Sequence, residues 1–275
     1  MWRAELVTPW RATTQDHYSP PAASARGSSI TDEGIAAGGC VEWHMKAGRC
    51  FLSAVAVLAL FNVARSLGLL GPARYVYVSV ILLVAVLALI AWGTGATRAD
   101  LGLDRSDLPA GVRYGAGAFG IVLLVLVVAA VIPATNGFLH DSRAQIGGGR
   151  LLYELGVPIV LLTAIPEEFA FRGVLLGSAL RMWGPWRASL VTSALFGLWH
   201  IAPALHTMSD NHEFAGAAAH TGGQVLLVLG SIAVTFAAGL VFCWLRLRSQ
   251  SLIAPVMAHV ATNGLALTVA WFAVH

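Results

Sequence analysis

Long apolar runs separated by short polar links fill the sequence after residue 50. Seven of these runs are predicted to be helices, at about residues 51–71, 75–96, 112–134, 152–181, 188–205, 222–245 and 251–273. A helix needs about 20 apolar residues to cross a hydrocarbon core about 30 Å thick, and several of the runs approach or exceed that length. The pattern predicts an all-α fold, a polytopic transmembrane bundle of about seven spans.

The first 48 residues follow a different pattern. They are rich in Ser, Thr, Ala, Gly and Pro and show no helical period, which is typical of disorder. We predict a disordered cytoplasmic tail over residues 1–48 and a transmembrane domain over residues 49–275. The first apolar run begins near Phe51 and is long enough to remain as a membrane helix, unlike a secretory signal. Met45, which precedes Lys46 and Arg49, is an alternative start to Met1.

Basic residues predict the orientation of the bundle, because Lys and Arg accumulate in cytoplasmic loops. With the N-terminus inside, the cytoplasmic loops of the seven spans carry Arg98, Arg105, Arg113, Arg181, Arg187, Arg246 and Arg248, whereas only Arg74, Arg143 and Arg150 lie outside. The tail adds Arg3, Arg11, Arg26, Lys46 and Arg49 to the inner side. We therefore expect an integral protein of the plasma membrane with a cytoplasmic N-terminus.

Composition excludes several classes of protein. The chain is 57% hydrophobic and 11% charged, with a mean hydropathy of +0.73, whereas soluble domains carry about 25% charged residues. A net charge of +3 comes without any cluster of basic and aromatic residues, so we expect no binding of nucleic acid. Cys40, Cys50 and Cys243 lie far apart, so we expect free thiols and neither a disulfide framework nor a zinc knuckle.

Charged residues interrupt the fourth apolar run, where each costs about 2.5 to 3.5 kcal/mol on insertion scales. Glu168 and Arg172 are spaced i, i+4 and can neutralise one another on one helical face. Glu167 lies about 100° further round the helix and is left without that partner. An unpartnered buried carboxylate suits a general base, although the Glu168–Arg172 pair taken alone also fits a purely structural ion pair.

Three polar residues fall within the later apolar runs. His200 lies in the fifth run, and His259 and Asn263 form another i, i+4 pair in the seventh. At about 1.5 Å per residue, Glu167, His200 and His259 lie roughly 21, 18 and 12 Å from the cytoplasmic ends of their helices, so they can meet in one layer. Together with Asn263, these residues supply a base, two imidazoles and an amide donor, which are the groups that amide hydrolysis requires. Phe196 and Trp199 are expected to be packing residues.

Three motifs occur in order on these runs: E-E-x-x-x-R (Glu167, Glu168, Arg172), F-x-x-x-H (Phe196, His200) and H-x-x-x-N (His259, Asn263). They resemble the CAAX protease and bacteriocin-processing family (CPBP, formerly Abi), which includes the CAAX prenyl endopeptidases. The resemblance covers roughly residues 150–270, the expected protease core. It implies that Glu167 and His200 activate water, that His259 and Asn263 hold the oxyanion, and that Glu168 and Arg172 orient the site.

The same resemblance bears on cofactors and substrates. The family is often labelled metalloprotease, which would make Glu167, His200 and His259 zinc ligands with one open position. A metal-free, glutamate-dependent mechanism is also proposed for relatives, and the chain has no H-E-x-x-H, so metal use stays open. The resemblance implies a peptide or lipidated peptide as substrate, of CAAX or bacteriocin type, in contact with membrane lipids.

Three functions compete on this basis. The leading hypothesis is an intramembrane endopeptidase that cleaves peptide bonds near the cytoplasmic side of the membrane. A transporter or proton relay would use Glu167 and the histidines to carry protons, but the inverted repeat typical of transporters is not visible. A noncatalytic membrane scaffold would retain the fold alone, and the intact motifs argue against it.

Overall fold

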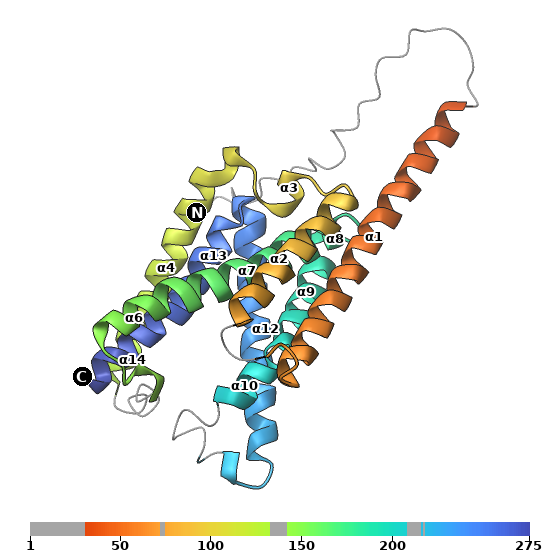
Figure 1. The fold of residues 1–275 in the computed structure, drawn as a ribbon. Helices are drawn as coiled ribbons and strands as arrows, with labels where there is room; N and C mark the ends of the chain where they lie inside the picture. Colours follow the sequence, from red (N-terminus) through yellow and green to blue (C-terminus); the bar gives the residue numbers. More distant parts are fainter. Residues whose placement is uncertain (1–30, 72–74, 133–141, 208–215, 217) are drawn as a thin grey trace. The chain divides into compact units, whose positions relative to one another are not determined.

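The computed structural model describes residues 31–71, 75–132, 142–207, 216 and 218–275, with side chains from residue 42 onward. All secondary structure within these ranges is helical (Figure 1). The elements are α1 (Thr31–Ser66), α2 (Val76–Gly93), α3 (Arg98–Leu101), η2 (Arg105–Asp107), α4 (Leu108–Val131), η3 (Ser142–Ala144), α6 (Gly148–Glu154), η4 (Leu155–Ala164), α7 (Ile165–Glu168), η5 (Phe169–Leu175), α8 (Leu176–Leu180), α9 (Pro185–Trp199), α10 (Ile201–Thr207), α12 (Gly223–Ser249), α13 (Ile253–Val260), η6 (Ala261–Leu265) and α14 (Ala266–Val274). Of the η elements, η4, η5 and η6 are π-helical and η2 and η3 are 3-10 turns.

Six helices within the described residues are long and apolar enough to cross a membrane. They are Glu42–Ser66, Val76–Gly93, Arg98–Val131, Pro185–Leu205, Gly223–Ser249 and Ile253–Val274. The prediction of an all-α, polytopic membrane protein is thereby confirmed. The run predicted at 152–181 is helical throughout residues 148–180, but it alternates between α and π geometry and is not one of the six. Its charged residues and changes of helical geometry distinguish it from the simple spans.

The chain divides into two compact units, residues 1–44 and residues 45–275, and the second contains the helical bundle. The boundary predicted at residue 48 falls inside α1, so residues 31–48 are helical instead of irregular. The sequence Thr31-Asp32-Glu33 gives a physical reason, because a hydroxyl residue followed by acidic residues is typical of a helix start. Residues 1–30 of the predicted tail, and Arg74 of the predicted outer loops, lie outside the described residues.

Glycines bring two pairs of helices into close contact. A Cβ atom at Gly239 of α12 would lie 2.9 Å from Cβ of Ser193 in α9, and one at Gly115 of α4 would lie 2.7 Å from Sδ of Met257 in α13. Small residues allow backbones to approach in this way inside a membrane, where packing rather than water drives association. The two close contacts fix α9, which ends directly before His200, and α13, which carries His259.

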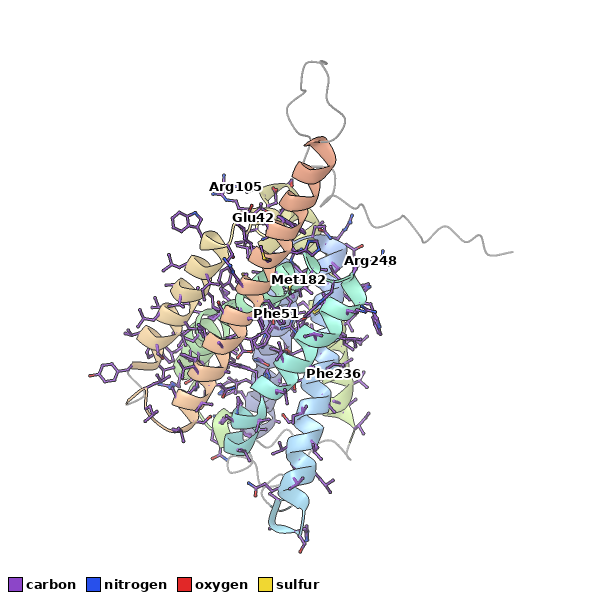
Figure 2. All side chains as sticks on the ribbon, turned by 90° about the vertical axis from the view of Figure 1, so that its right-hand side faces the viewer. Glu42, Phe51, Arg105, Met182, Phe236 and Arg248 are labelled. Carbon is purple, nitrogen blue, oxygen red and sulfur yellow. The ribbon has the colours of Figure 1, made fainter. Side chains whose placement is uncertain are left out.

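One end of the bundle carries most of the basic residues. The short helix α3 begins with a capping box formed by Thr97 and Asp100, and Arg246 of α12 donates from Nη2 to the carbonyls of Ala99 and Asp100 at 2.9 and 3.0 Å. Arg246 is buried there, and α3 packs against α8. Figures 1 and 2 show that α3, α8, and the labelled side chains of Arg105 and Arg248 lie at this end, opposite α10.

Candidate active site

The helical run that carries the predicted acidic motif is wider than a regular α-helix on both sides of the motif. The π-helical segments η4 and η5 flank the single α-turn α7, which contains Glu167 and Glu168. Pro158 and Pro166 lie in this run, and neither can donate the backbone hydrogen bond that an α-helix requires. Such local π turns occur frequently at functional sites. The proline residues are therefore a sequence feature that accounts for the irregular backbone before the motif.

Glu168 is the centre of a buried charged cluster. Its side chain is fully buried, and Oε1 accepts hydrogen bonds from Nη1 of Arg172 at 3.0 Å and from Nδ1 of His259 at 2.8 Å. The ion pair expected from the i, i+4 spacing of Glu168 and Arg172 is present. His259 extends it to α13, so one carboxylate joins two helices that are 91 residues apart in the sequence. Breaking a buried pair of this kind leaves an uncompensated charge in a medium of low dielectric constant.

Aromatic rings surround the guanidinium group of Arg172. Its Cζ lies 4.0 Å from the ring centroid of Phe196, 5.0 Å from that of Phe242 and 5.9 Å from that of Phe171. Nε and Nη2 of Arg172 have no hydrogen-bond partner among the described residues. The negative faces of the rings take the place of such partners, since a cation over an aromatic face is stabilised electrostatically. Sequence reasoning treated Phe196 as packing and gave no signal for Phe242.

Glu167, the residue before Glu168, faces the two histidines. Oε1 accepts a hydrogen bond from Nε1 of Trp199 at 3.1 Å. Oε2 has no hydrogen-bond partner among the described residues, and it lies 3.9 Å from Nε2 of His200 and 4.0 Å from Nε2 of His259. The side chain of Glu167 is 15% exposed. The expectation that Glu167, His200 and His259 meet in one layer is thus matched by the distances.

Hydrogen bonds at the opposite ring nitrogens define the tautomers of both histidines. Nδ1 of His200 lies 2.8 Å from the carbonyl oxygen of Phe196, and Nδ1 of His259 lies 2.8 Å from the Glu168 carboxylate. Because a carbonyl and a carboxylate only accept, both Nδ1 atoms carry the proton. In neutral rings both Nε2 atoms are then acceptors, and they face a third acceptor, Oε2 of Glu167. A molecule that donates two protons, such as water, can bridge Oε2 and one of the two Nε2 atoms.

The spacing of these atoms discriminates between a bridging water and a zinc ion. Two acceptors 3.9 to 4.0 Å apart can each lie about 2.8 Å from one water oxygen, with an angle of about 90° between them. Ligand atoms around tetrahedral zinc, bound at about 2.1 Å, lie only about 3.4 Å apart. Among the described residues, no group of three His, Cys, Asp or Glu side chains is arranged to hold a metal ion. The arrangement of Glu167, His200 and His259 therefore does not fit the zinc site considered from the sequence.

A cavity of about 430 Å³ opens onto Glu167. Its lining includes His200 and Asn263 beside Glu167, and Arg65 and Arg143 also contribute to it. Asn263 lies on the π-helical segment η6 and is exposed. The cavity therefore brings together three of the six predicted site residues, while Glu168, Arg172 and His259 support them from the buried side.

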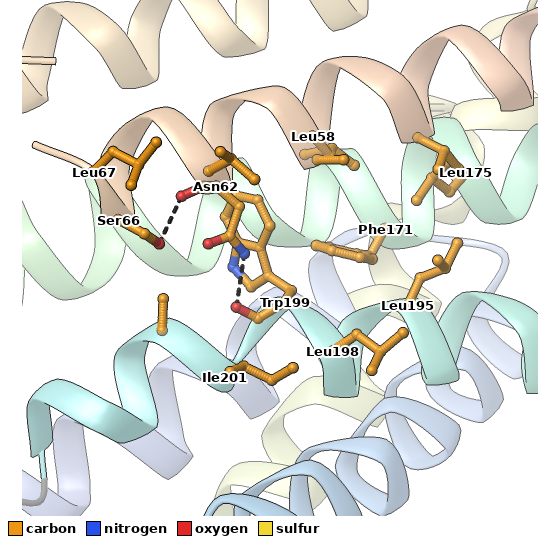
Figure 3. A pocket seen from close by; sticks show the side chains of 14 residues that line it. Leu58, Asn62, Ser66, Leu67, Phe171, Leu175, Leu195, Leu198, Trp199 and Ile201 are labelled. Carbon is orange, nitrogen blue, oxygen red and sulfur yellow. Dashed lines mark hydrogen bonds between the residues drawn. The ribbon is translucent and has the colours of Figure 1, made fainter. Parts of the chain in front are cut away.

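A second cavity, of about 420 Å³, adjoins the first and is almost entirely apolar. It lies between α1 and the α9–α10 region, and Figure 3 shows its lining. The two cavities share six residues: Leu58, Asn62, Ser66, Phe171, Trp199 and Ala202. Trp199 therefore lies between an apolar space and the polar cavity, whereas the sequence predicted only a packing role for it. Its indole N–H is the sequence feature that could have indicated a polar contact, because a buried tryptophan usually finds an acceptor.

Comparison with known proteins identifies the part of the chain that carries this site. Residues 150–265 match a family model described as type II CAAX prenyl endopeptidase Rce1-like, and all six predicted site residues lie within that range. No curated protein and no solved structure matches the chain. The family consists of peptidases, and the buried Glu and His residues are consistent with peptidase chemistry. Residues 150–265, a little over two fifths of the chain, are thus similar to the Rce1-like type II CAAX prenyl endopeptidases.

Proposed function

We propose that this protein is an intramembrane endopeptidase in which Glu167 and His200 activate a water molecule. One observation carries the proposal. Glu167 lines a cavity, and its buried Oε2, which has no hydrogen-bond partner among the described residues, lies 3.9 Å from Nε2 of His200 and 4.0 Å from Nε2 of His259. A carboxylate so placed can take a proton from a bridging water, which is the role of a general base.

The reaction is a hydrolysis in which all protons are accounted for. Oε2 of Glu167 removes one proton from the water, whose oxygen then attacks the carbonyl carbon of the scissile peptide bond. The Asn263 amide, which lines the same cavity, donates to the oxyanion that forms. Glu167 next delivers its proton to the amide nitrogen, the C–N bond breaks, and the second water proton leaves with the new carboxyl group. His200 orients the water through Nε2.

Glu168 and Arg172 act through His259. The Glu168 carboxylate, 2.8 Å from Nδ1, holds the proton of His259 on Nδ1 and so leaves Nε2 as an acceptor toward Glu167. Arg172 holds the other side of the same carboxylate oxygen. Neither Glu168 nor Arg172 lines the cavity, so both are positioning residues.

The substrate that we propose is a peptide carrying an apolar group, of the CAAX prenylated type, with a bacteriocin-type peptide as the other member of the same class. Two observations support it. The matched family is described by prenyl endopeptidase activity, and the apolar cavity adjoins the polar one across Trp199. An apolar chain in the second, apolar cavity would place the attached peptide beside Glu167 in the first.

The side of the membrane from which substrate enters needs its own test. The sequence predicts cleavage near the cytoplasmic side and also an N-terminus in the cytoplasm. The cavity includes Arg65, in the last turn of α1, and Arg143, in η3 between α4 and α6. With the N-terminus inside, this part of the cavity faces away from the cytoplasm. If the substrate enters past Arg65 and Arg143, a cytoplasmic N-terminus and cleavage near the cytoplasmic side cannot both be correct.

The decisive experiment is a cleavage assay with protein purified in detergent. Wild type, Glu167→Gln and His200→Gln are incubated with a peptide library that includes farnesylated CAAX peptides and the same sequences without the lipid. Glu154→Gln is the matched control, because Glu154 lies on the same helical run and pairs with the exposed Arg150. Each preparation is also assayed with a chelator, so that any requirement for a metal is measured directly.

We expect wild type and Glu154→Gln to cleave equally, and Glu167→Gln and His200→Gln to lose activity. Preference for farnesylated over unmodified peptide would support the prenylated substrate. If the folded Glu167→Gln variant cleaves like wild type, the endopeptidase proposal is wrong. Proton uptake by reconstituted wild-type protein, lost in Glu167→Gln, would instead support the proton relay.

A further inference from the structure

We propose that Trp199 is a positioning residue for Glu167, and that Asn62 of α1 holds Trp199 in place. The inference rests on the proposed function, because it assigns what keeps the general base in its working orientation. It also assigns a role to α1, which lies outside the matched domain at residues 150–265.

The indole of Trp199 determines which carboxylate oxygen faces the histidines. Nε1 of Trp199 donates to Oε1 of Glu167 at 3.1 Å, and an indole N–H can only donate. The two oxygens of a carboxylate are chemically equivalent and exchange places when the group rotates. With Oε1 held by the indole, Oε2 stays directed toward His200 and His259. Hydrogen bonds to an ionised acceptor are also about twice as strong as neutral ones.

The backbone carbonyl of Trp199 lacks its usual helical donor, and a side chain of α1 replaces that donor. In a continuous helix, the carbonyl of residue 199 would accept from the N–H of residue 203, but residue 203 is proline and has no N–H. The side-chain amide of Asn62 donates to this carbonyl at 3.0 Å (Figure 3). Asn62 thus replaces the missing backbone donor. The contact spans 137 residues of sequence and connects α1 to the end of α9.

Aromatic contacts fix the plane of the indole. Phe61, the neighbour of Asn62, stacks on Trp199 with ring centroids 6.1 Å apart and planes inclined by 13°. Phe171 approaches edge-on, at 5.8 Å and 68°. The rings of Phe61 and Phe171 thus contact the indole, while Asn62 binds its backbone carbonyl. A chain of contacts therefore runs from α1 through Trp199 to Oε1 of Glu167.

The first test removes the indole N–H and keeps an aromatic ring. In Trp199→Phe, we expect kcat to fall about 100-fold, the loss that a misplacement of about 1 Å can cause, with KM changed less than about twofold. The matched control is Trp183→Phe. Trp183 makes an edge-on contact with Phe51 of the same α1, at 5.3 Å, but does not line the cavity at Glu167. We expect it to cleave like wild type.

The second test uses the missing backbone donor. Asn62→Leu removes the amide at similar volume, and we expect kcat to fall about tenfold, since one net hydrogen bond of about 1.4 kcal/mol corresponds to that factor. Pro203→Ala in the same chain restores an N–H at residue 203. We expect the double variant to regain most of the lost kcat. Rescue of this kind would not follow if Asn62 served only to pack α1.

A spectroscopic measurement separates this inference from the proposed function. In protein with ¹⁵N-labelled tryptophan, the Trp199 indole resonance is assigned by its loss in Trp199→Phe. We expect it to shift in Glu167→Gln and in Asn62→Leu, whether or not the protein cleaves any peptide tried. Unchanged indole resonances in both variants, or wild-type kcat in folded Trp199→Phe, would overturn the inference. Inactive wild-type protein with the expected shifts would count against the endopeptidase proposal alone.

Discussion

Nδ1 of His259 lies 2.8 Å from Oε1 of Glu168, and this contact joins two motifs that the sequence separates by 91 residues. The same oxygen accepts from Arg172. One fully buried carboxylate therefore fixes the tautomer of His259, directs Nε2 toward Glu167 and balances a buried arginine. The positions of Arg172 and His259 therefore both depend on Oε1 of Glu168.

Replacing Glu168 with glutamine should destabilise the protein. The buried Arg172 would lose its charge partner, and removing one member of a buried pair costs about 3 to 5 kcal/mol. Thermal unfolding in detergent measures the effect. Glu154→Gln is the control, because its pair with Arg150 is largely exposed and such pairs contribute about 0 to 1 kcal/mol. Equal unfolding temperatures for the two variants would contradict the assignment.

Replacing Gly239 with alanine should disturb the contact between α12 and α9. The added Cβ would lie 2.9 Å from Cβ of Ser193, so the helices must separate, at a cost of about 1 to 3 kcal/mol. Because α9 ends beside His200, peptide cleavage should fall as well. Gly230→Ala, on the same helix, meets no described atom within 4 Å and should be neutral or slightly stabilising. Unfolding temperature and cleavage rate are both measured.

Asn263→Ala should lower kcat about 100-fold to 1000-fold, the usual cost of one oxyanion donor, and leave KM nearly unchanged. Thr268→Ala provides the comparison. Its hydroxyl donates to the carbonyl of Gly264 within the same helix, and Thr268 does not line the cavity. A large rise in KM with kcat intact would instead assign Asn263 to ground-state binding of the substrate.

The orientation can be read from cysteine labelling in intact cells. The excess of Arg at the α3 and α8 end predicts that this end is cytoplasmic. Arg143→Cys should then react with a membrane-impermeant maleimide added outside, whereas Arg248→Cys should react only after the cells are opened. Cys40→Ser provides the background, since Cys50 and Cys243 are buried. The reverse pattern would place the cavity's Arg65 and Arg143 on the cytoplasmic side.

Several features of the site followed from the sequence because they depend on local spacing. The pair Glu168 and Arg172 lies four residues apart, so any helix brings the two together. The lengths of the apolar runs were sufficient to predict the membrane helices, since the thickness of the hydrocarbon core sets the length of a span. The depth of Glu167, His200 and His259 was likewise a matter of helical rise.

Other features depend on how the helices pack, which no local pattern encodes. The contacts of Trp199 with Glu167 and Asn62 join residues 32 and 137 positions apart. The Phe242 ring of α12 lies over Arg172 of η5, and Gly239, one turn earlier in α12, lies against Ser193 of α9. The sequence by itself determined the membrane helices and the groups available for chemistry, because both follow from hydrophobicity and helical geometry. Only the tertiary structure decided which oxygen of Glu167 faces the histidines, because that depends on side chains from separate helices meeting at one point.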